Sequence, residues 1–290
     1  MLVMGEPLIW RCRDREIVCG ERTLLMGIVN VTPDSFSDGG AFLDTDSAVD
    51  QGVRLADEGA DLLDVGGEST RPGAEEVPVG EELDRVVPVV ERLVKEVDVP
   101  VGVDTRKPAV ARSALEAGAA IVNDVTAGGD PEMFAVARDD GAGLVLMHMR
   151  GDPKTMQEDP RYDDVVTQVR DYLASRIGSA VAAGVPRAQL CVDPGIGFGK
   201  NLEHNLAILR SVASFRELRT PVLVGASRKR FIGQLTGVED PADRIEGTAG
   251  AVAWCAAQGV DLVRVHDVWQ MRRVVNVVDA IARPTREAAG

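Results

Sequence analysis

The feature that most constrains the fold is a set of short apolar runs separated by amphipathic stretches. The runs are 24–29, 60–65, 100–104, 119–123, 143–147, 189–193, 221–225 and 260–266. Each is almost continuously apolar, which is typical of parallel strands buried on both faces. The stretches between them predict helices, because their apolar residues recur at helical spacing. In 163–184 these residues are Val165, Val169, Leu173, Ile177 and Val181.

Helix-boundary signals support this alternation. Asp130 is predicted to cap a helix that has Pro131 at its first position and ends at Gly141, and Lys107-Pro108 opens another. Eight strands, each followed by a helix, predict an α/β fold of the (β/α)8 TIM-barrel type, whose usual length is about 250 residues. A doubly wound open sheet is the alternative. Its G-x-G-x-x-G motif, however, is absent after the first strand.

The chain has short segments on either side of the predicted barrel. Residues 8–12 and 16–19 look like the two arms of a β-hairpin around Arg13-Asp14-Arg15. We interpret the hairpin as a cap over the N-terminal end of the barrel. The predicted domains are therefore the hairpin cap (1–23), the barrel (24–284) and a small polar tail (285–290).

Composition excludes several classes of protein. The net charge of −14 argues against a broad basic face, and so against nucleic-acid binding. No window approaches the roughly 18 apolar residues of a membrane span, and the first residues do not resemble a signal peptide. We therefore expect a cytoplasmic protein without a membrane partner. The 4 cysteines show no metal-binding spacing, so each is expected to act as a small apolar residue.

A hydrogen-bonding or charged side chain follows every predicted strand. In chain order these are Asn30, Glu68, Asp104, Asn123, His148, Asp193, the cluster 227–230, and Arg264 with His266. Active sites of barrel enzymes lie at this end of the strands. A helix cap explains any single one of these residues equally well. All eight positions together predict a functional site.

The residue types at this predicted site favour a flat heterocycle. The carboxylate of Asp193 can accept two adjacent N–H donors, which suits an aminopyrimidine edge. Asp104 and Asn123 would complete a polar rim, and Lys229 would donate to ring oxygen or nitrogen atoms. The alternative for Asp104 is a simple capping role for the following helix.

The ends of the last two strands favour an anion. Barrels commonly bind phosphate there, and Arg264 offers a planar fork for phosphate oxygens. Asn30, across the mouth, is a candidate ligand for Mg²⁺ that enters with a diphosphate. His266 is explained nearly as well by a hydrogen-bonded histidine at a strand end.

Two glycine-bracketed loops follow the first two strands, at 30–40 (NVTPDSFSDGG) and 66–73 (GGESTRPG). Glycine at both edges would permit a lid movement that excludes water.

Other catalytic mechanisms fit this sequence less well. The 3 histidines do not cluster as zinc ligands, and no G-x-S-x-G motif is present. Lys229 follows a strand as a Schiff-base lysine would, but its arginine neighbours suit anion contacts equally well.

Taken together, these motifs resemble the dihydropteroate synthases, barrel enzymes of the folate pathway. The matching segments are 26–40 (MGIVNVTPDSFSDGG), 64–74 (DVGGESTRPGA), 103–106 (VDTR), 123–125 (NDV), 147–151 (MHMRG), 193–200 (DPGIGFGK), 225–233 (GASRKRFIG) and 264–268 (RVHDV). They occur in order over nearly the whole barrel. The resemblance implies condensation of 6-hydroxymethyl-7,8-dihydropterin diphosphate with p-aminobenzoate, giving 7,8-dihydropteroate and diphosphate, with Mg²⁺ as cofactor.

The resemblance also implies roles for individual residues. The implied pterin-binding residues are Asp104, Asn123, Asp193, Lys229, Met147, Phe198 and Gly225. Those implied for diphosphate are Asn30, Arg264 and His266, with Asn30 also a Mg²⁺ ligand. Those implied for p-aminobenzoate are Phe36, Thr70, Pro72, Lys229 and Arg230. The implied catalytic set is Asp104, Lys229, Asp38 and Arg71. Many members have Ser at the position of Arg230, which leaves open the partner of the p-aminobenzoate carboxylate.

Two rival functions are a pterin-binding barrel that transfers methyl groups to a corrinoid protein, and a silent paralogue that only binds pterin. The intact lid loops count against the first, and the complete set of motifs counts against the second.

The apolar helix pattern at 272–281 predicts a homodimer, although burial under neighbouring elements explains it nearly as well. We also expect a local positive potential at the mouth, formed by Arg71, Arg264 and 228–230.

Overall fold

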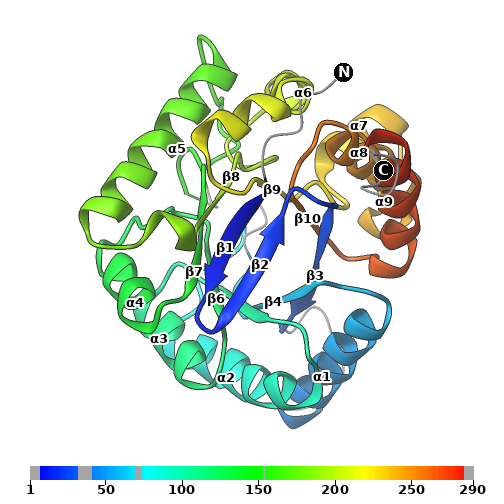
Figure 1. The fold of residues 1–290 in the computed structure, drawn as a ribbon. Coiled ribbons are helices and arrows are strands. Elements are labelled where there is room, and N and C mark those ends of the chain that lie inside the picture. The colour runs from blue at the N-terminus through cyan, green and yellow to red at the C-terminus, as the bar shows by residue number, and fades with distance from the viewer. Residues whose placement is uncertain (1–6, 32–40, 70–72, 153–154, 284–290) are drawn as a thin grey trace, which may run out of the picture.

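Eight parallel strands form the centre of the molecule (Figure 1), and the computed structural model describes residues 7–31, 41–69, 73–152 and 155–283. The strands are β3 Leu24–Asn30, β4 Leu62–Gly66, β5 Val101–Asp104, β6 Ile121–Asp124, β7 Gly143–Met147, β8 Leu190–Asp193, β9 Leu223–Val224 and β10 Leu262–Val265. Their order is β8-β7-β6-β5-β4-β3-β10-β9. A parallel bridge between Val192 and Val222 joins the two outermost strands and closes the ring. The predicted (β/α)8 barrel is confirmed.

Helices surround the barrel in chain order (Figure 1). They are α1 Ala41–Asp57, α2 Val79–Glu96, α3 Pro108–Glu116, α4 Glu132–Asp140, α5 Val165–Ala182, α6 Leu202–Arg210, α7 Arg230–Thr236, α8 Ile245–Ala257 and α9 Val268–Ala282. The predicted start of α4 was one residue too early, because Pro131 is the cap and the helix begins at Glu132. Asp130 still accepts a hydrogen bond from the backbone N–H of Glu132, at 3.0 Å. Gly141 ends α4 in the left-handed conformation, as predicted.

The predicted hairpin is present and covers the N-terminal end of the barrel. It consists of β1 Leu8–Cys12 and β2 Arg15–Cys19, and it crosses the front of the ring in Figure 1. Trp10 is fully buried among strand residues that include Met26 and Leu262. Its indole N–H donates to the carbonyl oxygen of Gln189 at 2.8 Å. The hairpin therefore closes the end of the barrel opposite the strand termini that were predicted to form the site.

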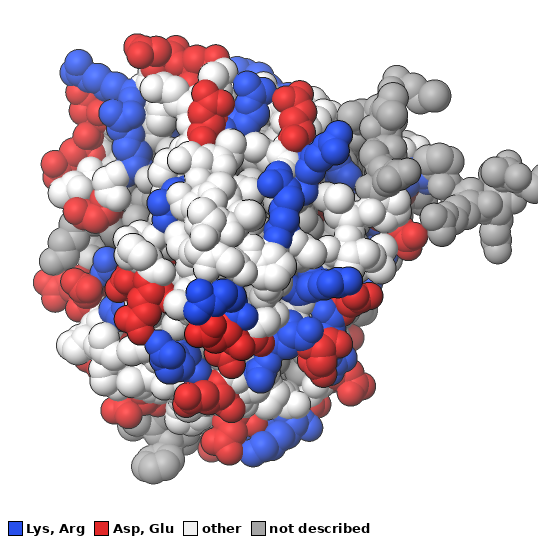
Figure 2. Space-filling model, turned by 60° about the vertical axis from the view of Figure 1, so that its left-hand side comes forward, with Lys and Arg blue, Asp and Glu red and all other residues white. Residues whose placement is uncertain are grey.

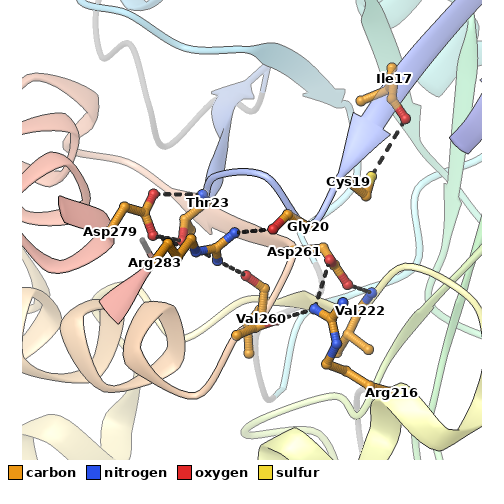
Figure 3. Close-up of polar contacts among 11 residues, drawn as sticks. Ile17, Cys19, Gly20, Thr23, Arg216, Val222, Val260, Asp261, Asp279 and Arg283 are labelled. Carbon is orange, nitrogen blue, oxygen red and sulfur yellow. Dashed lines mark hydrogen bonds and ion pairs between the residues drawn. The ribbon is translucent and has the colours of Figure 1, made fainter. Parts of the chain in front are cut away.

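Charged side chains tie α9 to this closed end (Figure 3). Arg283 donates to the carbonyl of Gly20 at 2.8 Å and to the hydroxyl of Thr23 at 3.0 Å. Asp279 accepts from the backbone N–H of Thr23 at 2.7 Å. The buried carboxylate of Asp261 lies 2.9 Å from Arg216 and accepts from the backbone of Val222. Because both carboxylates have donors, the contacts of Asp279 and Arg283 stabilise the packing of the C-terminal end of α9 against the segment that leads into β3.

The surface mixes charges of both signs. On the face drawn in Figure 2, acidic and basic side chains alternate around an uncharged area, and there is no broad basic region on that face. All 4 cysteines are buried and unpaired, as the sequence predicted. Within the described ranges, no helix has both the length and the apolar character needed to cross a bilayer.

Candidate active site

The polar residues predicted at the strand ends converge at one mouth of the barrel. Asp104 and Asn123 are directly opposite each other in the register of β5 and β6, and Asp193 ends β8 next to Met147 of β7. Asp104, Asn123 and Asp193 are all buried. Their side chains come from strands that are far apart in the sequence. They meet because the carboxyl ends of parallel strands lie on the same rim.

Arg264 reaches from β10 past the neighbouring β3 to acidic side chains on β4 and β5. Its Nε lies 2.6 Å from Oδ2 of Asp64, and its Nη2 lies 2.8 Å from Oδ2 of Asp104. The same Oδ2 of Asp64 accepts the side-chain N–H of Asn123 at 2.9 Å. Asp64 thus links a residue predicted to bind pterin to one predicted to bind diphosphate.

Asp64 was not among the predicted site residues, although it lies inside one of the matching segments. It is fully buried, and its Oδ1 has no hydrogen-bond partner among the described residues. Burying a carboxylate is costly unless it is paired. An aspartate in the middle of the apolar run 60–65 was therefore the available signal for a functional residue.

Burial changes the acidity of both carboxylates at the mouth. It raises the pKa of Asp104 to about 7, against the opposing effect of the Arg264 guanidinium. It raises the pKa of Asp193 to about 6, against a hydrogen bond from the backbone N–H of Gly195. That hydrogen bond is 2.7 Å long. Both groups therefore titrate close to neutral pH, as groups in binding and catalytic sites often do.

Lys229 lies beside these acids, immediately before α7. Its Nζ is 4.0 Å from the centre of the Phe198 ring, which gives a cation–π contact. Phe198 in turn packs with Met147 in a small apolar cluster. Gly225 follows β9, and a Cβ atom there would lie 3.9 Å from Oδ2 of Asp193 and from Cβ of Arg264. These four residues therefore lie at the same mouth as the two acids.

The remaining predicted residues fall into separate groups. His266 is partly buried, and its Nδ1 lies 3.0 Å from the hydroxyl of Ser227. Asn30 ends β3 at the same rim and is partly buried. Arg230 is exposed on the first turn of α7. Phe36, Asp38, Thr70, Arg71 and Pro72 lie outside the described residues.

Ion pairs reduce the positive charge expected at this rim. Arg228 has a left-handed backbone and pairs with Asp267, with Nε 3.0 Å from Oδ2. Arg264 is paired with two carboxylates, as described above. The predicted positive mouth remains a prediction.

A family model described as pterin binding enzyme matches residues 26–266. The dihydropteroate synthase of Synechocystis is 44% identical over 265 residues, covering 91% of this chain and 92% of that protein. The dihydropteroate synthase of Escherichia coli is 46% identical over 256 residues, covering 88% and 90%. These matches span the barrel and its mouth. The chain therefore belongs to the pterin-binding enzymes.

Similarity to solved structures identifies the branch of this family to which the chain belongs. Xanthomonas albilineans dihydropteroate synthase, solved with 4-aminobenzoic acid, has a TM-score of 0.90 at 47% identity, covering 96% of this chain and 100% of that one. The same enzyme in complex with 7,8-dihydropteroate has a TM-score of 0.85 at 45% identity, covering 95% and 100%. Within its family, the chain is placed among the dihydropteroate synthases, which are transferases.

Proposed function

We propose that the barrel mouth condenses 6-hydroxymethyl-7,8-dihydropterin diphosphate with p-aminobenzoate, and that the residues gathered there divide the work. The observation that carries this proposal is the convergence of Asp104, Asn123 and Asp193 at the barrel mouth, with Lys229 beside them. Buried carboxylates beside a buried amide match the row of donors and acceptors on an aminopyrimidine ring. Phe198 and Met147 offer apolar contact to the ring faces.

The diphosphate end would lie towards Asn30, Arg264 and His266. The described residues contain no group of three His, Cys, Asp or Glu side chains placed to hold a metal. Asn30 would supply a single amide oxygen as a ligand. One protein ligand fits a Mg²⁺ ion that keeps most of its waters and enters the site bound to the diphosphate. When bound, this ion would neutralise charge on the leaving group. Arg264 would add a fixed positive charge at the same place.

The reaction breaks the C–O bond between the pterin methylene and diphosphate, and it forms a C–N bond to the amine of p-aminobenzoate. As diphosphate leaves, positive charge develops on the methylene carbon. Ionised Asp104 and Asp193 would stabilise that charge from the pterin side. The amine nitrogen then attacks and loses a proton. An aniline nitrogen is already nucleophilic, so the site needs no strong general base.

The second substrate would be enclosed by residues of the two lid loops. These are Phe36, Asp38, Thr70, Arg71 and Pro72, together with Lys229 and Arg230. Closing such loops over the mouth would exclude water, which otherwise competes with the amine for the methylene. Asp38 and Arg71 complete the proposed catalytic set.

The test is incubation of the purified chain with pterin diphosphate, p-aminobenzoate and Mg²⁺, with detection of dihydropteroate by chromatography. Formation of the product is expected. A chain that binds pterin but forms no product would be a silent binding protein. Methyl transfer from a methylated pterin to a corrinoid protein, without dihydropteroate formation, would indicate the rival methyltransferase.

We further propose that the chain forms a homodimer through α9. Val275 is fully buried, so neighbouring elements account for part of the apolar pattern of this helix. Trp269, Val277 and Ile281 are 51%, 61% and 81% exposed on the same helix. Large exposed apolar side chains on one helix favour an interface. Light scattering that gives the mass of a single chain at micromolar concentration would contradict the proposal.

A further inference from the structure

Lys200 is a buried lysine that the proposed mechanism does not use. Only 2% of its surface is exposed, and it lies at the end of the loop between β8 and α6. Its Nζ is 2.9 Å from Nδ1 of His148, 2.9 Å from the carbonyl oxygen of Gly195 and 3.0 Å from that of Phe198. The carbonyl oxygen of His148 is a fourth neighbour, at 3.3 Å. Lysine is rarely buried this completely unless its charge is satisfied.

His148 acts as a fixed acceptor for this ammonium group. Burial, together with the nearby charge of Lys200, lowers the pKa of His148 to about 3, so the ring is neutral in the physiological range. Accepting a hydrogen bond at Nδ1 places the ring proton on Nε2. The ring meets Tyr172 edge to face at 4.9 Å, and the backbone N–H of His148 donates to the carbonyl of Asp193 at 2.9 Å. Lys200 therefore joins the chain after β7 to the chain after β8.

The loop that Lys200 holds carries three features of the proposed pterin pocket. Gly195 donates its backbone N–H to Oδ1 of Asp193. Phe198 places its ring under the ammonium group of Lys229. Gly197 faces the same lysine, since a Cβ atom there would lie 3.3 Å from Cδ of Lys229. Any shift of the loop would move all three contacts together.

The loop conformation requires glycine and has no spare room. Gly195 has a φ of +68°, and a Cβ atom there would lie 2.0 Å from the carbonyl oxygen of His148. This close approach is what brings the His148 and Gly195 carbonyls within reach of one ammonium group. The carbonyl groups of His148, Gly195 and Phe198 all lie in loops, and three carbonyls that point at one site repel each other unless a cation lies between them.

We propose that Lys200 is a positioning residue for the pterin site, and that its ammonium group holds the loop 194–199 in the shape that aligns Asp193, Phe198 and Lys229. The inference rests on the proposed pterin pocket. Lys200 acts through the loop that it holds and does not itself contact a reacting atom. A neutral side chain of the same length would fill the same space but would leave the carbonyl oxygens without donors.

The charge of Lys200 also predicts a pH dependence. Burial lowers the pKa of Lys200 to about 7, Asp193 opposes this, and Lys229 adds to it. The other titratable groups that face this cluster are His148, Arg150, Tyr162 and His204. The ammonium form dominates below the pKa of Lys200 and is lost as the pH rises through it. Affinity for pterin is therefore expected to fall on the alkaline side.

The decisive variant is Lys200→Met in the full-length chain, with calorimetric binding of dihydropterin diphosphate between about pH 6 and about pH 9. We expect Kd for this ligand to rise about 100-fold at pH 6, as expected for misplacement of binding groups by about 1 Å. We also expect the alkaline loss of affinity to disappear in the variant. KM for p-aminobenzoate, measured at saturating pterin diphosphate, is expected to rise by a much smaller factor, because Lys229 is the one residue among those aligned that is also proposed to contact p-aminobenzoate.

Lys95→Met is the matched control, because Lys95 is exposed and pairs with Glu91 at the surface, at 3.0 Å. It should leave Kd and its pH dependence unchanged. A folded Lys200→Met variant with wild-type affinity and pH profile would overturn the proposal. So would an equal loss of affinity for both substrates in proportion to the folded fraction, since that is the signature of a purely structural role.

If Lys200→Met does not fold, Tyr162→Phe tests the same loop from its other side. The Tyr162 hydroxyl donates to the carbonyl of Gly199 at 2.9 Å, and the change removes only that oxygen. Losing one hydrogen bond should raise Kd for dihydropterin diphosphate about 2- to 10-fold. An unchanged Kd would then overturn the proposal. Because these readouts are binding constants, they are separate from product formation, whose absence in the wild type would refute the proposed function instead.

Discussion

Oδ2 of Asp64 lies 2.6 Å from Nε of Arg264, and the same oxygen accepts the side-chain hydrogen bond of Asn123. One buried carboxylate therefore orients both a proposed pterin ligand and a proposed diphosphate ligand. The side chains proposed to bind the pterin end and the diphosphate end of the substrate are both hydrogen-bonded to Asp64. This arrangement suits a reaction in which the bond between pterin methylene and diphosphate must lie in one defined place.

Asp64→Asn is expected to lower kcat/KM by about 100-fold, because the carboxylate shared by Arg264 and Asn123 becomes a neutral amide with one acceptor oxygen and one donor nitrogen. The change should also cost about 1.5–3 kcal/mol of unfolding free energy, the usual contribution of a hydrogen bond to a charged group. Steady-state kinetics and urea unfolding measure the two effects. Asp139→Asn, at an exposed ion pair with Arg138, serves as the control and should change stability by less than about 0.5 kcal/mol. Wild-type kinetics in Asp64→Asn would show that Arg264 needs no such support.

Lys229→Ala is expected to abolish synthesis of dihydropteroate while the protein stays folded. The side chain is partly buried at the pocket edge and contacts Phe198, so its removal leaves the barrel core intact. Loss of one charged group at a site of developing charge typically costs about 100-fold or more in kcat. Circular dichroism would verify the fold, and product formation would be followed by chromatography. An unchanged kcat/KM in a folded variant would contradict the assignment of this lysine.

The raised pKa values of Asp104 and Asp193 predict an acid limb in the activity profile. Their ionised forms are proposed to stabilise positive charge on the methylene. The rate should therefore fall as the pH drops through about 7 for Asp104 and about 6 for Asp193. Initial rates from about pH 5 to about pH 8 measure this. A flat profile over that range would rule out a need for the ionised acids.

The same shifts predict the pH dependence of stability. Both acids have folded pKa values above the unfolded value of 3.8, so the folded state binds more protons than the unfolded state between those values. Their stabilising contribution is complete below the unfolded pKa and is lost as the pH rises through the folded pKa. Asp193→Asn should flatten the fall in unfolding free energy between about pH 4 and about pH 7. Urea titrations at several pH values would detect this. An identical slope in the variant would contradict it.

Trp10→Ala is expected to destabilise the chain by about 3–5 kcal/mol, because it leaves a cavity at the closed end of the barrel. It also removes the hydrogen bond to Gln189. Ile9→Ala on the same strand is the control, since Ile9 is 41% exposed, and its effect should be much smaller. Urea unfolding compares the two. Under folding conditions both variants should keep their activity, because the hairpin lies opposite the mouth; a selective loss of activity in Trp10→Ala would argue for coupling between the two ends.

The barrel and most of its site were predictable from the sequence because both depend on local patterns. Near-continuous apolar runs mark strands buried on both faces, and the residue that follows each run must lie at the common rim of a parallel barrel. This rule about strand ends predicts that Asp104, Asn123, Asp193 and Arg264 lie at one mouth of the barrel. The hairpin was visible for the same reason, as two short strands around a polar turn.

Which side chains meet across that mouth depended on the tertiary structure. Arg264 and Asp64 are 200 residues apart in the sequence. The hydrophobic pattern of the sequence cannot show that one guanidinium pairs with two acids from other strands of the barrel. In the sequence Lys200 is the last residue of the segment 193–200 (DPGIGFGK), and its burial depends on carbonyl groups of this loop and of His148, which follows β7. Sequence patterns report which residues are buried, whereas pairing follows from barrel closure and strand register. For that reason the sequence predicted that Asp104, Asn123, Asp193 and Arg264 lie at one rim, whereas the role of Asp64 and the partners of all these side chains were decided by the fold.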